Sequence, residues 1–467
     1  LPRTVGVVIV LAALATPLWW YMTRQPSWSH AASAFAVAGL VHASVRGDVR
    51  RGWRAGVSPG LWLGLVALVR PQDAVFVVVP LSLVGIAWRR GAALPDVGRV
   101  LAVMFGVALV VWLPQAWVWQ QTYGQPWLVP QGPQFMRWSE SQWSWVLWSS
   151  RGGLLAWSPA VAVALGGLLV GAVRRGPVRG LSRALVVAVI LEVFVCGAVA
   201  DWWGGWAFGA RRLVGCTVAF GVGWAVVLEP LVRGAKWKRG VVLLFSLAAV
   251  RLSMQMQADY LEARLQRGVP QSLAPAWSRA FGMPLDSGFE TVGTPGSWPA
   301  NWVFAARTGA EPGAYDEAVG WALVRSRGDD KGYERLWIHD SRWALSGLGA
   351  PHRRGGHQAR VIEERAVVGL PLRQGLVLDG RLRLWAGEVS ELRVEGWGDG
   401  STLALRPGWH DYPLPTGTEF EAGYGVIELV VTDGGPVEVA WLDVFVLGRD
   451  PMERPHGAQP PKGSSAS

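Results

Sequence analysis

The stretch Asp201-Trp-Trp-Gly-Gly-Trp-Ala-Phe-Gly-Ala-Arg-Arg212 joins two long apolar runs, Leu185–Ala200 and Leu213–Leu231. Apolar runs of this length on either side of a short polar loop are typical of consecutive membrane helices. The loop holds three tryptophans, three glycines and two adjacent arginines. Glycine lets a ligand approach the backbone closely, and paired arginines bind phosphate through planar forks. We therefore expect a site for a phosphorylated lipid, with an aromatic belt and two snorkelling arginines as the alternative.

The rest of the N-terminal half repeats this pattern. The chain has 467 residues, of which 51% are hydrophobic, and the apolar residues cluster before residue 258. Residues 1–258 therefore predict an α-helical polytopic membrane domain with nine hydrophobic segments. Two of them are short, at about 20 Å of helix against a hydrocarbon core of about 30 Å. The seven runs besides the two above are Val5–Met22, His30–Val45, Val57–Val69 and Val75–Trp88 (the short pair), Val100–Gln120, Ala156–Val173 and Val241–Gln257.

The basic residues lie mainly in alternate loops. Four loops carry 15 lysines and arginines, whereas the opposite loops carry six arginines. The positive-inside rule places the first set in the cytoplasm, so the loop 201–212 and everything after residue 257 lie outside. The net charge of +10 thus reflects topology and gives no support for nucleic-acid binding. We expect an integral protein of a bacterial cell membrane with an extracytoplasmic C-terminal domain. The four basic loops are 46–54, 89–99, 174–183 and 233–239.

The C-terminal part has a different composition. Residues 259–335 are rich in Pro, Gly and Trp and predict an irregular connector. Residues 336–450 contain short alternating runs separated by Gly, Asp and Pro, which predict an extracytoplasmic β-sandwich or jelly roll. Residues 451–467 predict a disordered tail. Such β domains often bind carbohydrate through surface aromatics, although core packing is the more common role of such side chains; the aromatics in question are Trp385, Trp397, Trp409 and Tyr412.

Several charges fall at or within the apolar runs. Arg70 and Asp73 join the two short segments, where they either line an internal site or form a salt bridge that ends a helix. Glu192 and Arg251 lie at similar depth in their runs, which predicts an ion pair. The sequence contains no complete set of metal ligands, so a divalent metal is left open as a cofactor. The two cysteines, Cys196 and Cys216, read as small buried residues.

Five segments of the N-terminal half carry a family resemblance. They are Thr16-Pro-Leu-Trp-Trp-Tyr21, Ser29-His30-Ala31, Gly64-Leu-Val-Ala-Leu-Val-Arg-Pro71, Arg151-Gly-Gly-Leu-Leu-Ala-Trp-Ser-Pro159 and Trp203–Arg212. Together they resemble the GT-C integral-membrane glycosyltransferases, similar to protein O-mannosyltransferases and the lipid A aminoarabinose transferase, and the resemblance covers roughly residues 1–258. These enzymes transfer a sugar from a polyprenyl-phosphate donor to a lipid, glycan or protein outside the cytoplasm.

The resemblance implies the following expectations for the site. The lipid phosphate is bound by Arg211 and Arg212, with Arg70 and Arg151 next. The remaining carboxylates, Asp201 and Asp73, are weak choices for acid or base. The substrate is lined by side chains and backbone of the first outward helix end and of the loop: His30, Trp202, Trp203, Gly204, Gly205 and Trp206.

The chain departs from the family at one point. The family's catalytic acid lies in the first extracytoplasmic loop, but Thr23–Ser29 contains no Asp or Glu. We therefore expect the catalytic loop to lie upstream of Leu1, with a catalytically inactive relative as the alternative. The competing functional classes are a membrane anchor that presents a carbohydrate-binding β domain and a transporter of lipid-linked glycans.

Overall fold

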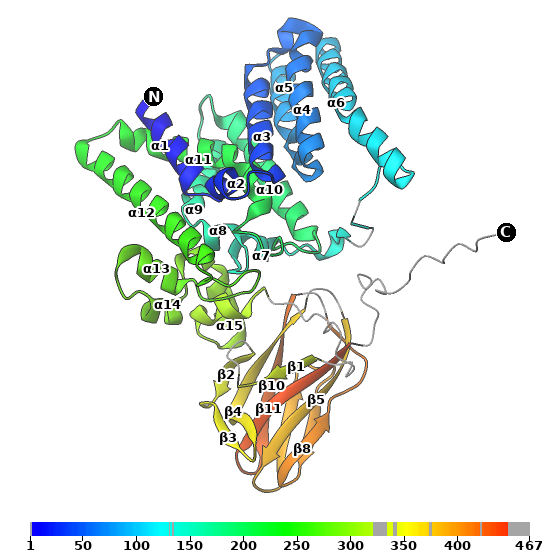
Figure 1. Ribbon diagram of the computed structural model, residues 1–467, viewed down its shortest axis with the longest axis vertical. Helices are drawn as coiled ribbons and strands as arrows, with labels where there is room; N and C mark the ends of the chain where they lie inside the picture. Colours follow the sequence, from blue (N-terminus) through cyan, green and yellow to red (C-terminus); the bar gives the residue numbers. More distant parts are fainter. Residues whose placement is uncertain are drawn as a thin grey trace, which may run out of the picture. The chain divides into compact units, whose positions relative to one another are not determined.

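The computed structural model describes residues 2–129, 131–132, 135–320, 334–339, 343–372, 376–420 and 423–446 (Figure 1). The chain divides into two compact units. The first, the helical unit, comprises Leu1–Leu128 and Trp138–Trp321, and the second, the β unit, comprises Val129–Arg137 and Ala322–Ser467. A helical N-terminal part followed by a mainly-β C-terminal part is thus confirmed.

All nine predicted apolar runs fall on helices. Five helices of the described chain are long and apolar enough to cross a membrane. They are Pro71–Arg89, which joins η2 (Pro71–Val77) to α5 (Val78–Arg89); α6 (Leu94–Tyr123); α10 (Arg179–Ala198); Arg211–Val232, which joins η5 (Arg211–Cys216) to α11 (Thr217–Val232); and α12 (Lys236–Leu261). The shorter helices are α1 (Pro2–Leu14), α2 (Leu18–Thr23), α3 (Ser29–Arg46), η1 (Val49–Gly56), α4 (Val57–Val69), α8 (Leu154–Trp157) and α9 (Val161–Val173).

Prolines explain why two predicted runs are divided. The run Val5–Met22 is split into α1 and α2 just before Pro17, and the run Ala156–Val173 is split around Pro159. Proline has no backbone N–H and clashes with the preceding turn, so it ends or interrupts a helix. Nine full membrane crossings are therefore not shown, although the helical character of each run is.

The outer surface of the longest helix is apolar. In α6 only 11% of the most hydrophobic window is buried, and large side chains such as Leu109, Val110 and Trp117 are more than half exposed. Exposed apolar surface of this extent is costly in water and natural in lipid. This surface fits a helix that faces the bilayer.

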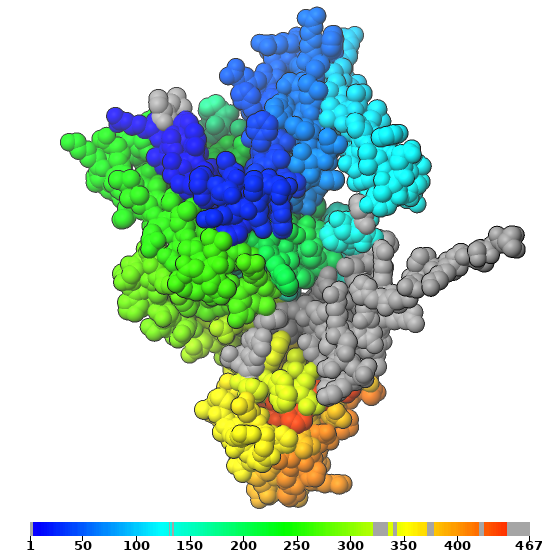
Figure 2. All heavy atoms as spheres, viewed as in Figure 1, coloured from blue at the N-terminus to red at the C-terminus, as the bar shows by residue number. Residues whose placement is uncertain are grey.

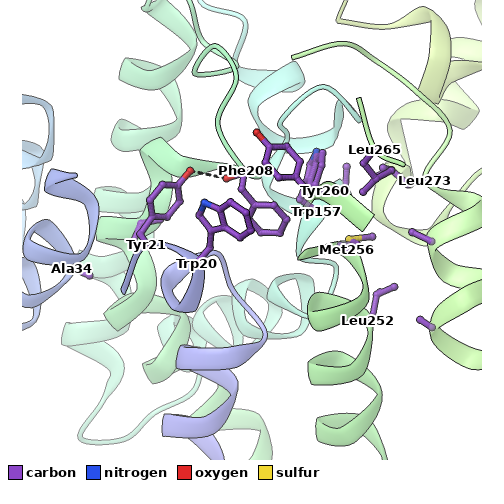
Figure 3. Packing of buried hydrophobic residues seen from close by; sticks show 14 residues of the cluster. Trp20, Tyr21, Ala34, Trp157, Phe208, Leu252, Met256, Tyr260, Leu265 and Leu273 are labelled. Carbon is purple, nitrogen blue, oxygen red and sulfur yellow. Dashed lines mark hydrogen bonds between the residues drawn. The ribbon is translucent and has the colours of Figure 1, made fainter. Parts of the chain in front are cut away.

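An aromatic cluster joins the start and the end of the helical unit. Trp20 of α2 stacks on Phe208 at 4.9 Å and meets the edge of Tyr260 of α12 at 5.3 Å (Figure 3). Trp157 of α8 packs on the same Phe208 at 5.2 Å. In the space-filling view, blue residues of α1 and α2 accordingly lie beside green residues of α12 (Figure 2). The cluster holds the loop 201–212 against elements that are distant in sequence.

Residues 259–320, part of the predicted irregular connector, contain short helices and group with the helical unit. Buried Asp259 anchors this region, because Arg279 and Arg264 lie 2.9 and 3.3 Å from its carboxylate. Residues 321–333 of that predicted connector lie outside the described residues. The short helices of this region are α13 (Ala274–Phe281), α14 (Asp286–Val292), α15 (Ala300–Thr308) and α16 (Tyr315–Ala318), with η6 (Pro295–Ser297) and η7 (Pro312–Ala314). Two further short helices of the helical unit lie earlier in the chain, η4 (Trp138–Glu140) and α7 (Trp143–Trp148).

The described strands of the β unit form one antiparallel sheet with the order β7-β6-β10-β4-β11-β5-β8. The long strand β4 joins its two halves, because Arg360–Ile362 pair with β11 and Arg365–Leu372 pair with β10. The strands are β1 (Glu334–Trp337), β2 (Ala344–Leu348), β3 (His352–Arg354), β4 (His357–Leu372), β5 (Leu376–Ala386), β6 (Ser390–Glu395), β7 (Ser401–Leu405), β8 (Gly408–Pro413), β9 (Thr418–Phe420), β10 (Gly423–Asp433) and β11 (Val437–Val446). The predicted disordered tail 451–467 lies outside the described residues.

The four aromatic side chains considered for sugar binding differ in burial. Trp397 is fully buried, its indole donates to the carbonyl of Pro415 at 2.9 Å, and its ring lies against Gly380. Tyr412 accepts a hydrogen bond from the backbone N–H of Arg406 at 2.7 Å. Trp385 and Trp409 are half-buried and pair across β5 and β8. Trp397 is thus a core residue, and the other three reach the surface in part.

Candidate anion-binding site

The loop 201–212 is held in one conformation by hydrogen bonds to two tyrosines. The hydroxyl of Tyr21 donates to the carbonyl of Phe208 at 2.8 Å (Figure 3), and that of Tyr260 donates to the carbonyl of Trp206 at 2.5 Å. Gly204 and Gly205 have φ values of +79° and +64°, which glycine adopts without strain. A Cβ atom on Gly204 would lie 2.5 Å from Nε of Arg211, so glycine at this position leaves the room that the Arg211 side chain occupies.

The loop's two arginines share one carboxylate. Asp201 lies 2.5 Å from Arg212 and 3.7 Å from Arg211. Both arginine side chains are largely buried, and the Nε atom of each has no hydrogen-bond partner. Two guanidinium groups against one carboxylate leave an excess positive charge. Buried donors without acceptors are costly, so this pair is suited to an anionic ligand.

A third arginine reaches the same place from another part of the chain. Arg70 ends α4, and its Nη1 atom lies 2.7 Å from Nδ1 of His30 in the first turn of α3. A guanidinium group can only donate, so Nδ1 of His30 accepts and its ring proton resides on Nε2. Tyr21 lies against the same imidazole, with ring centroids 4.6 Å apart. His30 thus keeps an N–H donor available on the side away from Arg70.

These side chains line a shallow, open cavity of about 350 Å³, which we call the His30 cavity. Its wall is formed by three arginines and by neutral polar or aromatic side chains, and Asp73 and Asp201 are not among the lining residues. The guanidinium group of Arg211 also lies 5.1 Å from the ring of Trp28. Such a wall offers several N–H donors to the oxygens of a phosphate. The lining residues are Trp28, Ser29, His30, Arg70, Gln72, Arg211 and Arg212.

Two buried carboxyl groups lie behind this wall. Asp73 is 4.0 Å from Nε of Arg70 and accepts a hydrogen bond from Ser33. Glu192 accepts a hydrogen bond from Gln72 at 3.0 Å. The predicted ion pair between Glu192 and Arg251 is wrong, because Arg251 instead donates to the carbonyl of Ala280 at 3.1 Å. The helix that carries Glu192, α10, packs against η2 and α5, which brings Gln72 to it.

The other predicted site residues have different surroundings. Arg151 donates to the carbonyls of Gly268 at 2.8 Å and Gly320 at 2.7 Å, and it lies 3.7 Å over the ring of Trp203. Trp202 is buried against Trp145, whereas Trp206 is 78% exposed. These residues do not line the His30 cavity. Arg151 therefore fastens chain segments together.

Three lining residues were not predicted, namely Trp28, Ser29 and Gln72. Trp28 and Ser29 directly precede His30, and Gln72 lies between Arg70 and Asp73, so their position beside predicted residues was the available signal. Among the described residues, no group of three or more His, Cys, Asp or Glu side chains could hold a metal ion.

Comparisons with protein families and with curated proteins give no match. Among solved structures, the chain is similar to the Podospora anserina GH26-CBM35 beta-(1,4)-mannanase, with 15% identity, a TM-score of 0.22, and coverage of 28% of this chain and 30% of the other. The Arthrobacter globiformis T6 isomalto-dextranase complexed with panose matches with 17% identity, a TM-score of 0.19, and coverage of 24% and 23%. CsCBM6-3 from Clostridium stercorarium in complex with cellobiose matches with 19% identity, a TM-score of 0.19, and coverage of 26% and 98%. Similarities this weak say nothing about what this chain binds.

Proposed function

We propose that the chain is a membrane glycosyltransferase that takes a sugar from a polyprenyl-phosphate donor. In this proposal the phosphate occupies the His30 cavity, and the sugar passes to a lipid, glycan or protein acceptor outside the cytoplasm. The observation that carries the proposal is the convergence of Arg70, Arg211 and Arg212 on one cavity. Phosphate binding by Arg211 and Arg212 was expected from the sequence of their loop, and phosphate binding by Arg70 was expected from the resemblance.

The segments that carry the GT-C resemblance also contact one another. Tyr21 of the first segment hydrogen bonds to Phe208 of the last, and His30 of the second contacts Arg70 of the third. Trp157 of the fourth packs on Phe208. These segments, which are distant in sequence, therefore lie together in the fold, as expected if they act on one ligand. The extracytoplasmic side of this site and of the β unit rests on the charge of the loops and belongs to the proposal.

The reaction would be a displacement at the anomeric carbon. An oxygen of the acceptor hydroxyl forms the new bond, the bond from that carbon to the phosphate oxygen breaks, and the electron pair leaves with the phosphate. The three arginines neutralise the charge that develops on the phosphate. The hydroxyl proton passes to a base. We assign the base to neither Asp201 nor Asp73, because each lies beside arginine and outside the cavity wall.

Sugar transfer by the native protein tests the proposal. Membranes that contain it are supplied with polyprenyl-phosphate-linked hexoses and pentoses labelled in the sugar, and the label that leaves the polyprenyl-phosphate pool is measured. Arg211→Gln should abolish transfer. The matched control is Arg24→Gln, since Arg24 is exposed on the same expected side and does not line the cavity. Equal transfer by both variants would overturn the proposal.

A second function, glycan binding by the β unit, is favoured by one face of its sheet. Trp385 of β5 lies directly opposite Trp409 of β8, and both are half-buried. Arg354 lies 3.9 Å over the ring of Trp385. Arg354 covers one face of Trp385, so a sugar would stack on the exposed part of the indole pair that Arg354 leaves open. Calorimetry measures glycan binding by the whole chain and by Trp409→Ala. If Trp409→Ala alone loses glycan binding and Arg211→Gln leaves sugar transfer unchanged, glycan binding would be the function and the glycosyltransferase proposal would be wrong.

A further inference from the structure

A second cavity, which we call the Arg179 cavity, lies at the other end of the membrane-length helix Pro71–Arg89. Its volume is about 820 Å³, and it is lined by the end of α3, the end of α5, the start of α10 and the segments that adjoin them. The helix Pro71–Arg89 begins beside Arg70 and Gln72 of the His30 cavity and ends at the Arg179 cavity. A helix of 19 residues is on the order of 30 Å long, which equals the thickness of the hydrocarbon core. The two cavities therefore lie at opposite ends of a helix that is long enough to cross the bilayer.

The Arg179 cavity carries a strong positive charge. Five arginines and a single carboxylate, Asp48, are among its lining residues. Asp48 accepts a hydrogen bond from the backbone N–H of Arg50 at 3.1 Å, so it caps η1. In the part of the chain that the structure describes, no carboxylate forms a salt bridge with any of the five arginines. They are Arg50, Arg90, Arg175, Arg179 and Arg183.

One of these arginines, which is partly buried, has a buried donor atom without a partner. The Nε atom of Arg179 is buried and has no hydrogen-bond acceptor. By contrast, Nε of Arg183 donates to the carbonyl of Ala172 at 2.9 Å. A buried donor without an acceptor is destabilising unless a ligand supplies one. Arg179 thus points to an anionic ligand in the cavity.

The same cavity also has an apolar wall. Leu83, Ile86 and Ala87 of α5 line it beside the arginines. Further along α5, Leu81 and Trp88 are 37% and 53% exposed, as expected on a helix surface that faces lipid. A soluble anion would use only the arginines, whereas an anion attached to acyl chains would use both kinds of surface. Basic pockets between membrane helices at the cytoplasmic side are known to suit phospholipid headgroups.

We propose that the Arg179 cavity binds the phosphate headgroup of an anionic phospholipid from the leaflet opposite the His30 cavity. The arginines contact the phosphate oxygens, and the first carbons of the acyl chains lie along α5. By the charge of its loops this leaflet is the cytoplasmic one. The site is separate from the proposed donor site, so it neither requires nor supports sugar transfer.

The test measures lipid retention by the whole protein. The protein is reconstituted in vesicles of phosphatidylcholine with added phosphatidylglycerol, extracted gently, and examined by native mass spectrometry for bound lipid. Arg175→Gln/Arg179→Gln should weaken phosphatidylglycerol retention about 30-fold, from roughly 1 kcal/mol for each basic residue. The control Lys236→Gln/Lys238→Gln removes equal charge at the start of α12, at residues that do not line the cavity, and should retain the lipid. Equal loss in both variants, or none in either, would overturn the proposal.

Two further measurements keep the proposal open to refutation. Inorganic phosphate is offered to the wild-type protein as a competitor, and displacement of phosphatidylglycerol by millimolar phosphate would make this a soluble-anion site. Should the double variant fold poorly, a photoactivatable phosphatidylglycerol is cross-linked to the wild-type protein. Labelling should concentrate on residues 83–92 and 175–183. Labelling spread evenly over all four basic loops would contradict a defined site.

Discussion

Replacing Gly204 with alanine should displace Arg211 without unfolding the protein. Gly204 has φ of +79°, and alanine in that region costs about 1 kcal/mol. Its new methyl group would lie 2.5 Å from Nε of Arg211, a separation that real side chains essentially never show. Arg211 must therefore retreat by about 0.5 Å or more, because van der Waals contact begins beyond 3 Å. A charged hydrogen bond is worth about 1.5–3 kcal/mol, so we expect polyprenyl phosphate to bind at least about 10-fold more weakly.

Gly205→Ala is the matched control for this change. Gly205 has φ of +64°, but a Cβ atom there would meet nothing within 4 Å. Both variants thus carry similar backbone strain, and only one moves Arg211. We expect similar falls in melting temperature for the two proteins in detergent, and weaker binding in Gly204→Ala alone. If both variants lose the same affinity, backbone strain accounts for the loss and the assigned role of Arg211 is refuted.

Three more predictions concern residues around the site and the short helices. Asp201→Asn should strengthen binding of polyprenyl phosphate, because it removes the negative charge that competes with the phosphate for Arg211 and Arg212; weaker binding in native mass spectrometry would show that Asp201 instead positions the two arginines. Arg151→Lys should lower the melting temperature but leave that binding unchanged, because Arg151 holds two backbone carbonyls outside the cavity; a selective loss of binding would place it in the site after all. Burial raises the pKa of Asp316 from 3.8 to about 7, so between pH 4 and 7 only the unfolded state releases the proton and stability falls as pH rises. Melting temperatures of Asp316→Asn from pH 4 to 8 should lack this fall, and an unaltered pH profile would contradict the assignment.

The sequence predicts where the helices of this chain lie better than it predicts which helices pack against one another. The boundaries of α4 coincide with the predicted run Val57–Val69. The helix begins where the apolar run begins, and it ends before Arg70-Pro71 because proline cannot continue a helix. The depth of a charged residue within its apolar run was a poor guide to its ion-pair partner. The predicted pair of Glu192 and Arg251 required that their two helices face each other. In the structure α10 faces η2 and α5, while α12 packs against α1, α11 and α13. Hydrophobic periodicity is too weak in nearly uniform apolar helices to reveal which faces meet.

The candidate site was predictable in its parts but not in its assembly. Arg70, Arg211, Arg212 and His30 were each expected near a ligand, and the structure brings all four to one cavity. The contact between His30 and Arg70 spans 40 residues of sequence and depends on how α3 packs on α4. Arg151 looked equivalent to the others as a basic residue in an outward loop. Its fixation by the carbonyls of Gly268 and Gly320 depends on tertiary contacts that no local pattern reveals.

The most direct test of the central claim is the affinity of the purified protein for polyprenyl phosphate and for the corresponding polyprenol, which lacks the phosphate. The measurement compares wild-type protein, Arg211→Gln and Arg24→Gln in the same lipid nanodiscs. We expect the wild type and Arg24→Gln to prefer polyprenyl phosphate, and Arg211→Gln to lose at least about 10-fold of that preference. Equal affinity of the wild type for the two lipids, or an unchanged preference in Arg211→Gln, would contradict phosphate binding in the His30 cavity.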